Sequence, residues 1–119
     1  MQAQPLWEHH CMVRYHELDL RGMVRLPVVM TWLQDAGIAH ATALGVSVRD
    51  LRTLGLTWVL SRLNLELQQY PRNNEQVLVR TWPVTREGRF SVRDFELFDA
   101  QGAPIGRATS SWAALNLTT

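Results

Sequence analysis

Asp19 is the residue of this 119-residue chain best placed for acid–base chemistry. It stands just before a segment that we predict to be helical, whose first backbone N–H groups are oriented donors that could polarise a substrate oxygen. Its carboxylate could then act as a general base towards water or as a nucleophile. The alternative is a turn, because Asp19 and Gly22 are typical turn residues and the carboxylate would then bond only to nearby backbone.

Asp35 is the second candidate base, with Gln34 beside it. Its charge lies among apolar residues of the predicted helix, so the carboxylate must reach solvent or find a partner. In a buried cleft its pKa would rise, as a general base requires; the alternative is a solvated or interface-paired carboxylate. Gln34 could orient water or a substrate beside either carboxylate.

The four histidines and the one cysteine indicate no metal site, and we expect neither a metal nor another cofactor. His9 and His10 fall at the start of the first predicted strand, and His40 lies well along the predicted helix. No carboxylate or cysteine stands at ligand spacing from them. Cys11 cannot form an intramolecular disulfide because it has no partner cysteine.

The composition describes a folded chain with balanced charge. Hydrophobic residues make up 46%, charged residues 19%, and the net charge is +1. These values exclude disordered and low-complexity classes and give no basic surface for nucleic acid. No apolar run approaches the roughly 18 to 20 residues of a membrane span. A basic start followed by an apolar run is not seen, so no signal peptide is predicted and we expect a cytoplasmic protein.

One helix is predicted between Leu26 and Leu44. Pro27 suits its first turn, and Gly45 is a typical stop. The residues that recur at helical spacing are Val29, Leu33, Ala36, Ala39, His40 and Ala43. Small residues fill the later turns, so another element can approach closely, as when a sheet wraps around a helix. A short second helix or turn is expected over residues 48–54.

Alternating residues predict strands in the rest of the chain. The expected strands cover residues 8–16, 59–67, 76–84, 90–99 and 105–117, with turns at 87–88 and 100–102. In the second strand, Val59, Ser61, Leu63, Leu65 and Leu67 should share one face. This order predicts an α+β fold with one helix on an antiparallel sheet. The exposed edges of such a sheet favour dimerisation.

Several blocks resemble the acyl-ACP thioesterases of plants and bacteria, in colinear order across most of the chain. They are Leu33-Gln34-Asp35-Ala36 with His40, residues 58–62 followed by Tyr70-Pro71, Thr81-Trp82, Arg93-Asp94, and residues 105–110 with Trp112. The resemblance implies the hotdog fold, one central α-helix wrapped by a five-stranded antiparallel sheet, as a single domain over residues 1–119. Members of that family resemble two hotdog domains in tandem, and these blocks belong to the first. Because the catalytic Asp, Asn and His of the family lie in the second domain, the resemblance implies a share of the acyl-chain tunnel and half of a pseudo-dimer.

A second resemblance concerns the opening of the chain. Residues 13–15, Glu17, Asp19, Gly22 and Val24 are similar to the start of the 4-hydroxybenzoyl-CoA thioesterase-like hotdogs, which have one domain. That pattern places a catalytic aspartate at Asp19. In that pattern a His or Asn and a Tyr usually follow the Gly. This sequence departs from it, because residues 23–27 intervene after Gly22 and Val28 and Val29 follow.

Four residues are candidates for holding a substrate. Trp32 and Trp58 could line an acyl chain, which gains about 0.8 kcal/mol per buried methylene. Core packing is the alternative for both, and it is the stronger interpretation for Trp82 and Trp112. Arg25 and Arg62 could meet the phosphates of CoA or of a phosphopantetheine arm, or face water only.

Together these observations predict a hydrolase of fatty-acyl thioesters carried on CoA or acyl carrier protein. Asp19 would be its base or nucleophile, and helix-start amides would hold the oxyanion. The chain would form a homodimer or a dimer of dimers, with no nucleic-acid or membrane partner. The alternative is a non-catalytic acyl-binding module, or the isolated N-terminal half of a two-domain acyl-ACP thioesterase.

Overall fold

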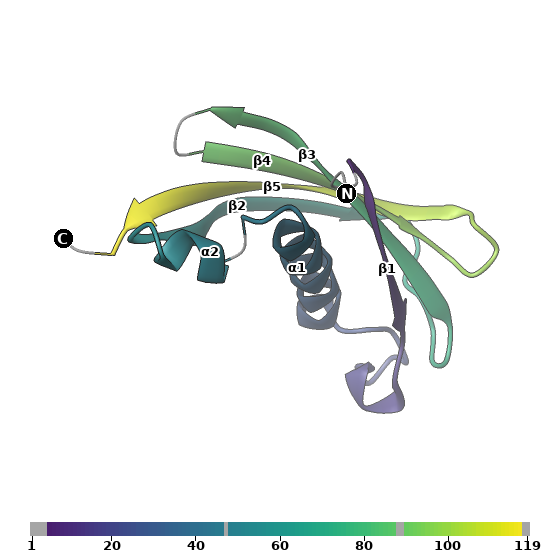
Figure 1. Cartoon of the computed structure of the whole chain (residues 1–119). Coiled ribbons are helices and arrows are strands. Elements are labelled where there is room, and N and C mark those ends of the chain that lie inside the picture. Colours follow the sequence, from purple (N-terminus) through teal and green to yellow (C-terminus); the bar gives the residue numbers. More distant parts are fainter. Residues whose placement is uncertain (1–4, 47, 88–89, 118–119) are drawn as a thin grey trace.

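The computed structural model describes residues 5–46, 48–87 and 90–117. Its elements are β1 (Trp7–Met12), a 3-10 turn (Tyr15–Glu17), α1 (Leu26–Ala43), α2 (Val48–Arg52), β2 (Leu56–Leu67), β3 (Gln76–Glu87), β4 (Phe90–Phe98) and β5 (Pro104–Asn116). The strands form one curved sheet, and α1 lies against its concave face (Figure 1). The α+β arrangement of one long helix on a five-stranded sheet is therefore confirmed.

The sheet has the strand order β1-β3-β4-β5-β2, and every neighbouring pair is antiparallel. Strands β3, β4 and β5 form the predicted meander, and β1 and β2 are the two edges. Within the described residues, β2 pairs only with β5, so one long edge of the sheet carries unpaired backbone groups.

The core lies between α1 and the concave face of the sheet. On the helix, the buried residues recur three to four positions apart; they are Val29, Trp32, Leu33, Ala36 and His40. On the strands, every second side chain points towards the helix, as in Val77, Val79 and Thr81 of β3. Helix α1 ends where Gly45 adopts a φ of 77°, a conformation that glycine tolerates best.

In strand β2 the alternation of inward and outward side chains differs from the predicted one. A β-bulge between Leu60 and Arg62 inserts Ser61 as an extra residue, which shifts the side-chain parity of the strand. As a result, Val59 is 41% exposed, while Leu60 is half-buried on the face that was expected to be polar. The prediction that Val59 and Ser61 share a face with Leu63 was wrong for this reason.

The first strand is shorter than predicted. It ends at Met12, and the chain then enters the 3-10 turn, in which the Glu17 carboxylate accepts a hydrogen bond of 2.8 Å from the Arg14 backbone. The predicted turn at residues 87–88 lies partly outside the described residues. No described helix is long and apolar enough to cross a membrane.

Candidate functional site

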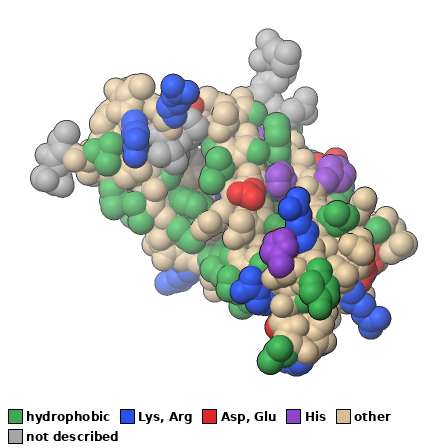
Figure 2. All heavy atoms as spheres, turned by 90° about the horizontal axis from the view of Figure 1, so that it is seen from below, with side chains coloured by type: hydrophobic (Ala, Val, Ile, Leu, Met, Phe, Trp, Pro, Cys, Tyr) green, Lys and Arg blue, Asp and Glu red, His purple; other side chains and the backbone are tan. Residues whose placement is uncertain are grey.

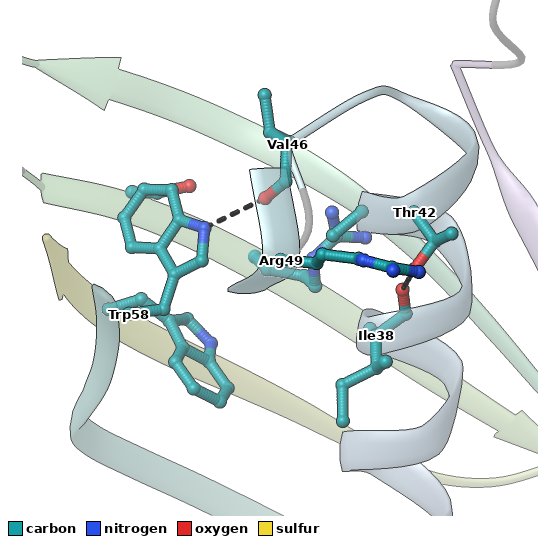
Figure 3. Close-up of a pocket in the computed structure, with 10 residues that line it drawn as sticks. Ile38, Thr42, Val46, Arg49 and Trp58 are labelled. Atoms are coloured by element: carbon teal, nitrogen blue, oxygen red, sulfur yellow. Dashed lines mark hydrogen bonds between the residues drawn. The ribbon is translucent and has the colours of Figure 1, made fainter. Parts of the chain in front are cut away.

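A pocket of about 340 Å³ lies between α1, α2 and the concave face of the sheet. Its walls come from both helices, the loop between them, and strands β2, β4 and β5. The lining residues are Gly37, Ile38, Ala41, Thr42, Val46, Arg49, Trp58, Ser91, Arg93 and Trp112. Figure 3 shows Trp58 on the sheet side facing Ile38 and Thr42 on α1. The volume is at the lower end of the range for small-molecule sites, about 300–1,000 Å³.

Two tryptophans form the apolar walls of the pocket. The Trp58 Nε1–H donates to the Val46 carbonyl oxygen over 3.0 Å, which ties β2 to the loop after α1 (Figure 3). The Trp112 Nε1–H donates to Ser110 Oγ over 2.9 Å. Because both indole N–H groups have acceptors, the apolar ring surfaces are what the tryptophans offer to a ligand.

A polar group of side chains lies beneath α1 beside these walls. Arg93 on β4 is only 8% exposed, and His40 and Thr81 are fully buried. Arg93 Nη1 lies 2.8 Å from His40 Nδ1 and donates to Thr81 Oγ1 over 3.2 Å. Donation to His40 requires a lone pair on Nδ1, so the ring is neutral with its proton on Nε2. The Trp7 ring stacks on the His40 ring, with ring centroids 5.8 Å apart.

Burial sets the electrostatics of this group. Desolvation lowers the pKa of Arg93 from its ordinary value. Gly37 of α1 packs directly above the arginine, since a Cβ built there would lie 3.4 Å from Arg93 Cδ. The absence of a side chain at Gly37 therefore keeps the pocket open next to the guanidinium.

Asp19 lies outside this pocket, in the turn before α1. One carboxylate oxygen accepts from the backbone N–H of Arg21 (2.8 Å) and of Met23 (3.1 Å), and the other accepts from the Arg21 guanidinium (3.0 Å). The Met23 backbone N–H, followed by the Arg21 side chain, lowers the pKa of Asp19. These are the contacts of a turn-forming aspartate.

Asp35 and Trp32 lie at a second cleft, between β1 and α1. It has a volume of about 320 Å³ and is lined by His9, His10, Cys11, Met12, Arg14, Glu17, Val28, Thr31, Trp32 and Asp35. Seen from the helix side, histidine and arginine side chains gather near acidic ones on this face (Figure 2). Burial, with the charges of Asp35 and Glu17, raises the pKa of the Cys11 thiol to about 12. Asp35 itself is exposed.

The remaining predicted residues are dispersed. Gln34 on α1, Arg25 before it and Arg62 on β2 are all exposed, and none of them lines the main pocket. Of the predicted site residues, only Trp58 lies there, and Asp19, Asp35 and Trp58 occupy three separate places. Among the residues that the structure describes, no group of three or more His, Cys, Asp or Glu side chains could hold a metal ion.

The predicted site residues include only one residue of the pocket lining, Trp58, and two of those that they lack matter most for its chemistry. Trp112 was expected in the core, but it is half-buried and lines the pocket. Arg93 was noted only within a family block. Its signal was present in the alternation of β4, in which Arg93 shares the inward parity of Phe95 and Leu97.

Acyl-ACP thioesterases are similar to this chain in sequence and in structure. The family model "Acyl-ACP thioesterase N-terminal domain" matches residues 5–119. The oleoyl-acyl carrier protein thioesterase 1 of Arabidopsis thaliana, named as chloroplastic, is 33% identical over 115 residues, which cover 90% of this chain and 32% of that protein. A crystal structure of an acyl-ACP thioesterase from Bacteroides thetaiotaomicron is 31% identical, with a TM-score of 0.93, over 96% of this chain and 47% of that one.

A DHNA-CoA thioesterase from Staphylococcus aureus shares the fold, with 23% identity and a TM-score of 0.87 over 96% of this chain and 76% of that one. These likenesses confirm the hotdog fold that the sequence resemblance implied. The chain spans about a third of the length of the curated plant relatives that it matches. Because the family model covers nearly all of the sequence, the chain belongs to the acyl-ACP thioesterase family and corresponds to its N-terminal domain.

Proposed function

We propose that this chain is the acyl-binding half of a thioester hydrolase, which releases fatty acids from acyl carrier protein or CoA once a second hotdog domain is in place. The observation that carries the proposal is the pocket between the helices and the sheet, with Trp58, Trp112 and Ile38 in its walls. Such walls favour an alkyl chain, since each buried methylene contributes about 0.8 kcal/mol. Membership of the acyl-ACP thioesterase family supports the same substrate class.

In this proposal the second hotdog domain is a further copy of this chain. The unpaired edge of β2 supports pairing, because its 12 residues offer a long row of backbone donors and acceptors. Leu54, Leu115 and Leu117, near the end of this edge, are exposed apolar side chains that a partner could cover. A homodimer or a dimer of dimers is the form that we propose for the isolated chain.

Hydrolysis needs a base and donors for the oxyanion. In the homodimer, Asp19 would activate water, and Asp35 with Gln34 would be the second candidate pair. At the start of α1, Pro27 has no N–H and the Val28 N–H donates to the Arg25 carbonyl over 3.0 Å. The Leu26 N–H is thus the donor that the first helical residues offer to an oxyanion. Arg25 and Arg62 are exposed and would meet the phosphates of the carrier.

A non-catalytic acyl-binding module is the second candidate, and the contacts of Asp19 favour it. A carboxylate held by two backbone N–H groups and a guanidinium is stabilised in its ionised form, which weakens it as a base. In a two-domain enzyme the catalytic groups would come from the other domain, and this chain would bind the acyl group alone.

One experiment distinguishes hydrolysis of the acyl thioester from binding of the acyl group. The purified chain is incubated with decanoyl and hexadecanoyl thioesters of CoA and of acyl carrier protein. A thiol reagent measures hydrolysis, and titration calorimetry measures binding. Thiol release supports the complete hydrolase, and binding without release supports the module. Absence of both from the folded chain overturns the proposed function.

Asp19→Asn then tests the base. Asn keeps the oxygen that accepts the two backbone bonds, so the turn should form. Asp99→Asn is the matched control, because Asp99 accepts from the backbone of Gln101 and Ala103 in a similar turn remote from the pocket. Loss of thiol release in Asp19→Asn alone supports Asp19 as the base, and full activity removes it from the mechanism.

A further inference from the structure

Arg93 is a buried cation without an anionic partner among the described residues. It is 92% buried, and no described carboxylate lies within ion-pair distance of it. Its hydrogen bonds to His40 and Thr81 both use Nη1. Within the described part of the chain, Nε and Nη2 have no acceptor, and the residue lines the main pocket. Part of the guanidinium fork is therefore available to a molecule in the pocket.

Among the described residues, the charges around the pocket are of one sign. Arg93 and Arg49 both line it, and the described part of its lining contains no aspartate or glutamate. Figure 3 shows Arg49 reaching from α2 towards the α1 turn of Ile38 and Thr42. Apolar walls of low dielectric strengthen the attraction between such cations and an anion.

A ligand that is only an alkyl chain would leave the positive charge of Arg93 without a partner. A buried cation is costly unless it is paired, and a methyl terminus would leave it unpaired. A carboxylate matches it, because the planar guanidinium donates two parallel hydrogen bonds to the two carboxylate oxygens. The indole faces of Trp58 and Trp112 then remain for the apolar part of the ligand.

We propose that this pocket binds a carboxylate carried on an apolar chain, with the carboxylate on Nε and Nη2 of Arg93 and the chain against Trp58 and Trp112. The inference rests on the proposed function, because it uses the same pocket and narrows the class of ligand. Two sources provide this chemistry. One is the free fatty acid released by hydrolysis, and the other is an acyl thioester with a second carboxylate at its far end.

Titration calorimetry on the full chain tests the proposal with two ligands of equal chain length. Decanoate carries the carboxylate, and 1-decanol carries a neutral hydroxyl. We expect decanoate to bind at least about tenfold more tightly, the usual order for a charge-assisted contact. Equal affinities overturn the proposal whatever any variant does. Binding of decanol and decanoyl-CoA without that preference leaves the proposed function standing, so the two failures are distinguishable.

Variants assign the preference to Arg93. Arg93→Met removes the charge and the donors, and Arg93→Gln removes the charge but keeps a donor for His40 or Thr81, which protects the fold. Arg107→Met is the matched control, because Arg107 is exposed, pairs with Glu66 and does not line the pocket. We expect both Arg93 variants, or Arg93→Gln alone if Arg93→Met does not fold, to lose the preference. Its persistence in a folded Arg93 variant, or its loss in Arg107→Met, overturns the proposal.

Two further measurements distinguish the sources of the carboxylate. If the site takes the free acid, decanoate competes with decanoyl-CoA for the wild-type chain and loses that competition in Arg93→Gln. If it takes a terminal carboxylate, 9-carboxynonanoyl-CoA binds more tightly than decanoyl-CoA, again only with Arg93 present. Either pattern supports the carboxylate site, and the absence of both overturns it.

Discussion

Arg93 and His40 share a hydrogen bond of 2.8 Å between Nη1 and Nδ1, enclosed between α1 and the sheet. The bond joins the long helix to strand β4 at the edge of the pocket. It therefore ties the helix to the sheet beside the pocket and links the stability of the domain to the shape of that pocket.

Replacing His40 by leucine should lower the free energy of unfolding by about 1–3 kcal/mol. Leucine fills most of the space but accepts no hydrogen bond, so Arg93 Nη1 keeps only Thr81 as its acceptor. Urea unfolding measures the change. His16→Ala, at an exposed position, is the control and should stay within about 0.5 kcal/mol of the wild type. Equal stability of His40→Leu and the wild type would contradict the assigned role of the bond.

Gly106 should not accept a side chain. A Cβ there would lie 2.8 Å from the Glu66 carbonyl oxygen and 2.7 Å from Leu67 Cδ2, so the β2–β5 pair would have to shift. We expect Gly106→Ala to cost about 1–3 kcal/mol of stability in urea unfolding. Gly37→Ala is the control, because its Cβ meets Arg93 Cδ at 3.4 Å, an ordinary contact, and alanine favours a helix by up to about 1 kcal/mol. The prediction fails if the two variants are equally stable.

The sequence predicted the positions of the helices and strands better than it predicted which strand side chains face the core. Helical spacing and the Pro27 and Gly45 signals place α1 within one residue of its observed end. The bulge at Ser61 could not be predicted, because a bulge depends on pairing with β5 and leaves no characteristic residue type. That one inserted residue moves Val59 outwards and Leu60 inwards.

The site was harder to predict than the fold, for a related reason. The sequence directed attention to carboxylates, yet Asp19 and Asp35 lie in separate places outside the main pocket. Arg93 would have been found by asking why a charged residue shares the parity of Phe95 and Leu97. Which strand residues line the pocket, as Trp112 does, depends on the curvature of the sheet, and no local pattern encodes that.

The stability of the turn at Asp19 should depend on pH. The Met23 backbone N–H and the Arg21 side chain lower the pKa of Asp19 below its ordinary value of 3.8. The folded-state pKa is thus below the unfolded one, so the ionised carboxylate stabilises the fold above about pH 4, and this stabilisation is lost as the pH falls through the folded-state pKa. Thermal unfolding should show Asp19→Asn less stable than the wild type at pH 7, with the difference shrinking as the pH falls below the ordinary pKa of the carboxyl. A difference that persists at low pH would show that charge is not its cause.

Cys11 should be a poorly reactive thiol in the folded chain. Burial and the charges of Asp35 and Glu17 raise its pKa to about 12, so at pH 8 its thiolate fraction is about a thousandth of that of an ordinary cysteine. We expect alkylation by iodoacetamide to be at least about a hundredfold slower in buffer than in urea. Asp35→Asn removes one of the charges that oppose ionisation and should accelerate the reaction of the folded chain. Equal rates in buffer and in urea would contradict the raised pKa.

Filling the pocket should abolish acyl binding without unfolding the domain. Ala41 lines the pocket from α1, and a phenylalanine there would place its ring in a cavity of about 340 Å³ beside Trp58. Ala43, two residues further along the same helix, is exposed and does not line the pocket, so Ala43→Phe is the matched control. We expect the Kd for decanoyl-CoA to rise at least about tenfold in Ala41→Phe, because the ring occupies the space of the apolar chain, and to change less than about twofold in Ala43→Phe. Circular dichroism is the measurement that checks whether both variants fold. Unchanged binding by a folded Ala41→Phe would show that the acyl group binds elsewhere, since a chain cannot pass through a space that a buried ring already fills.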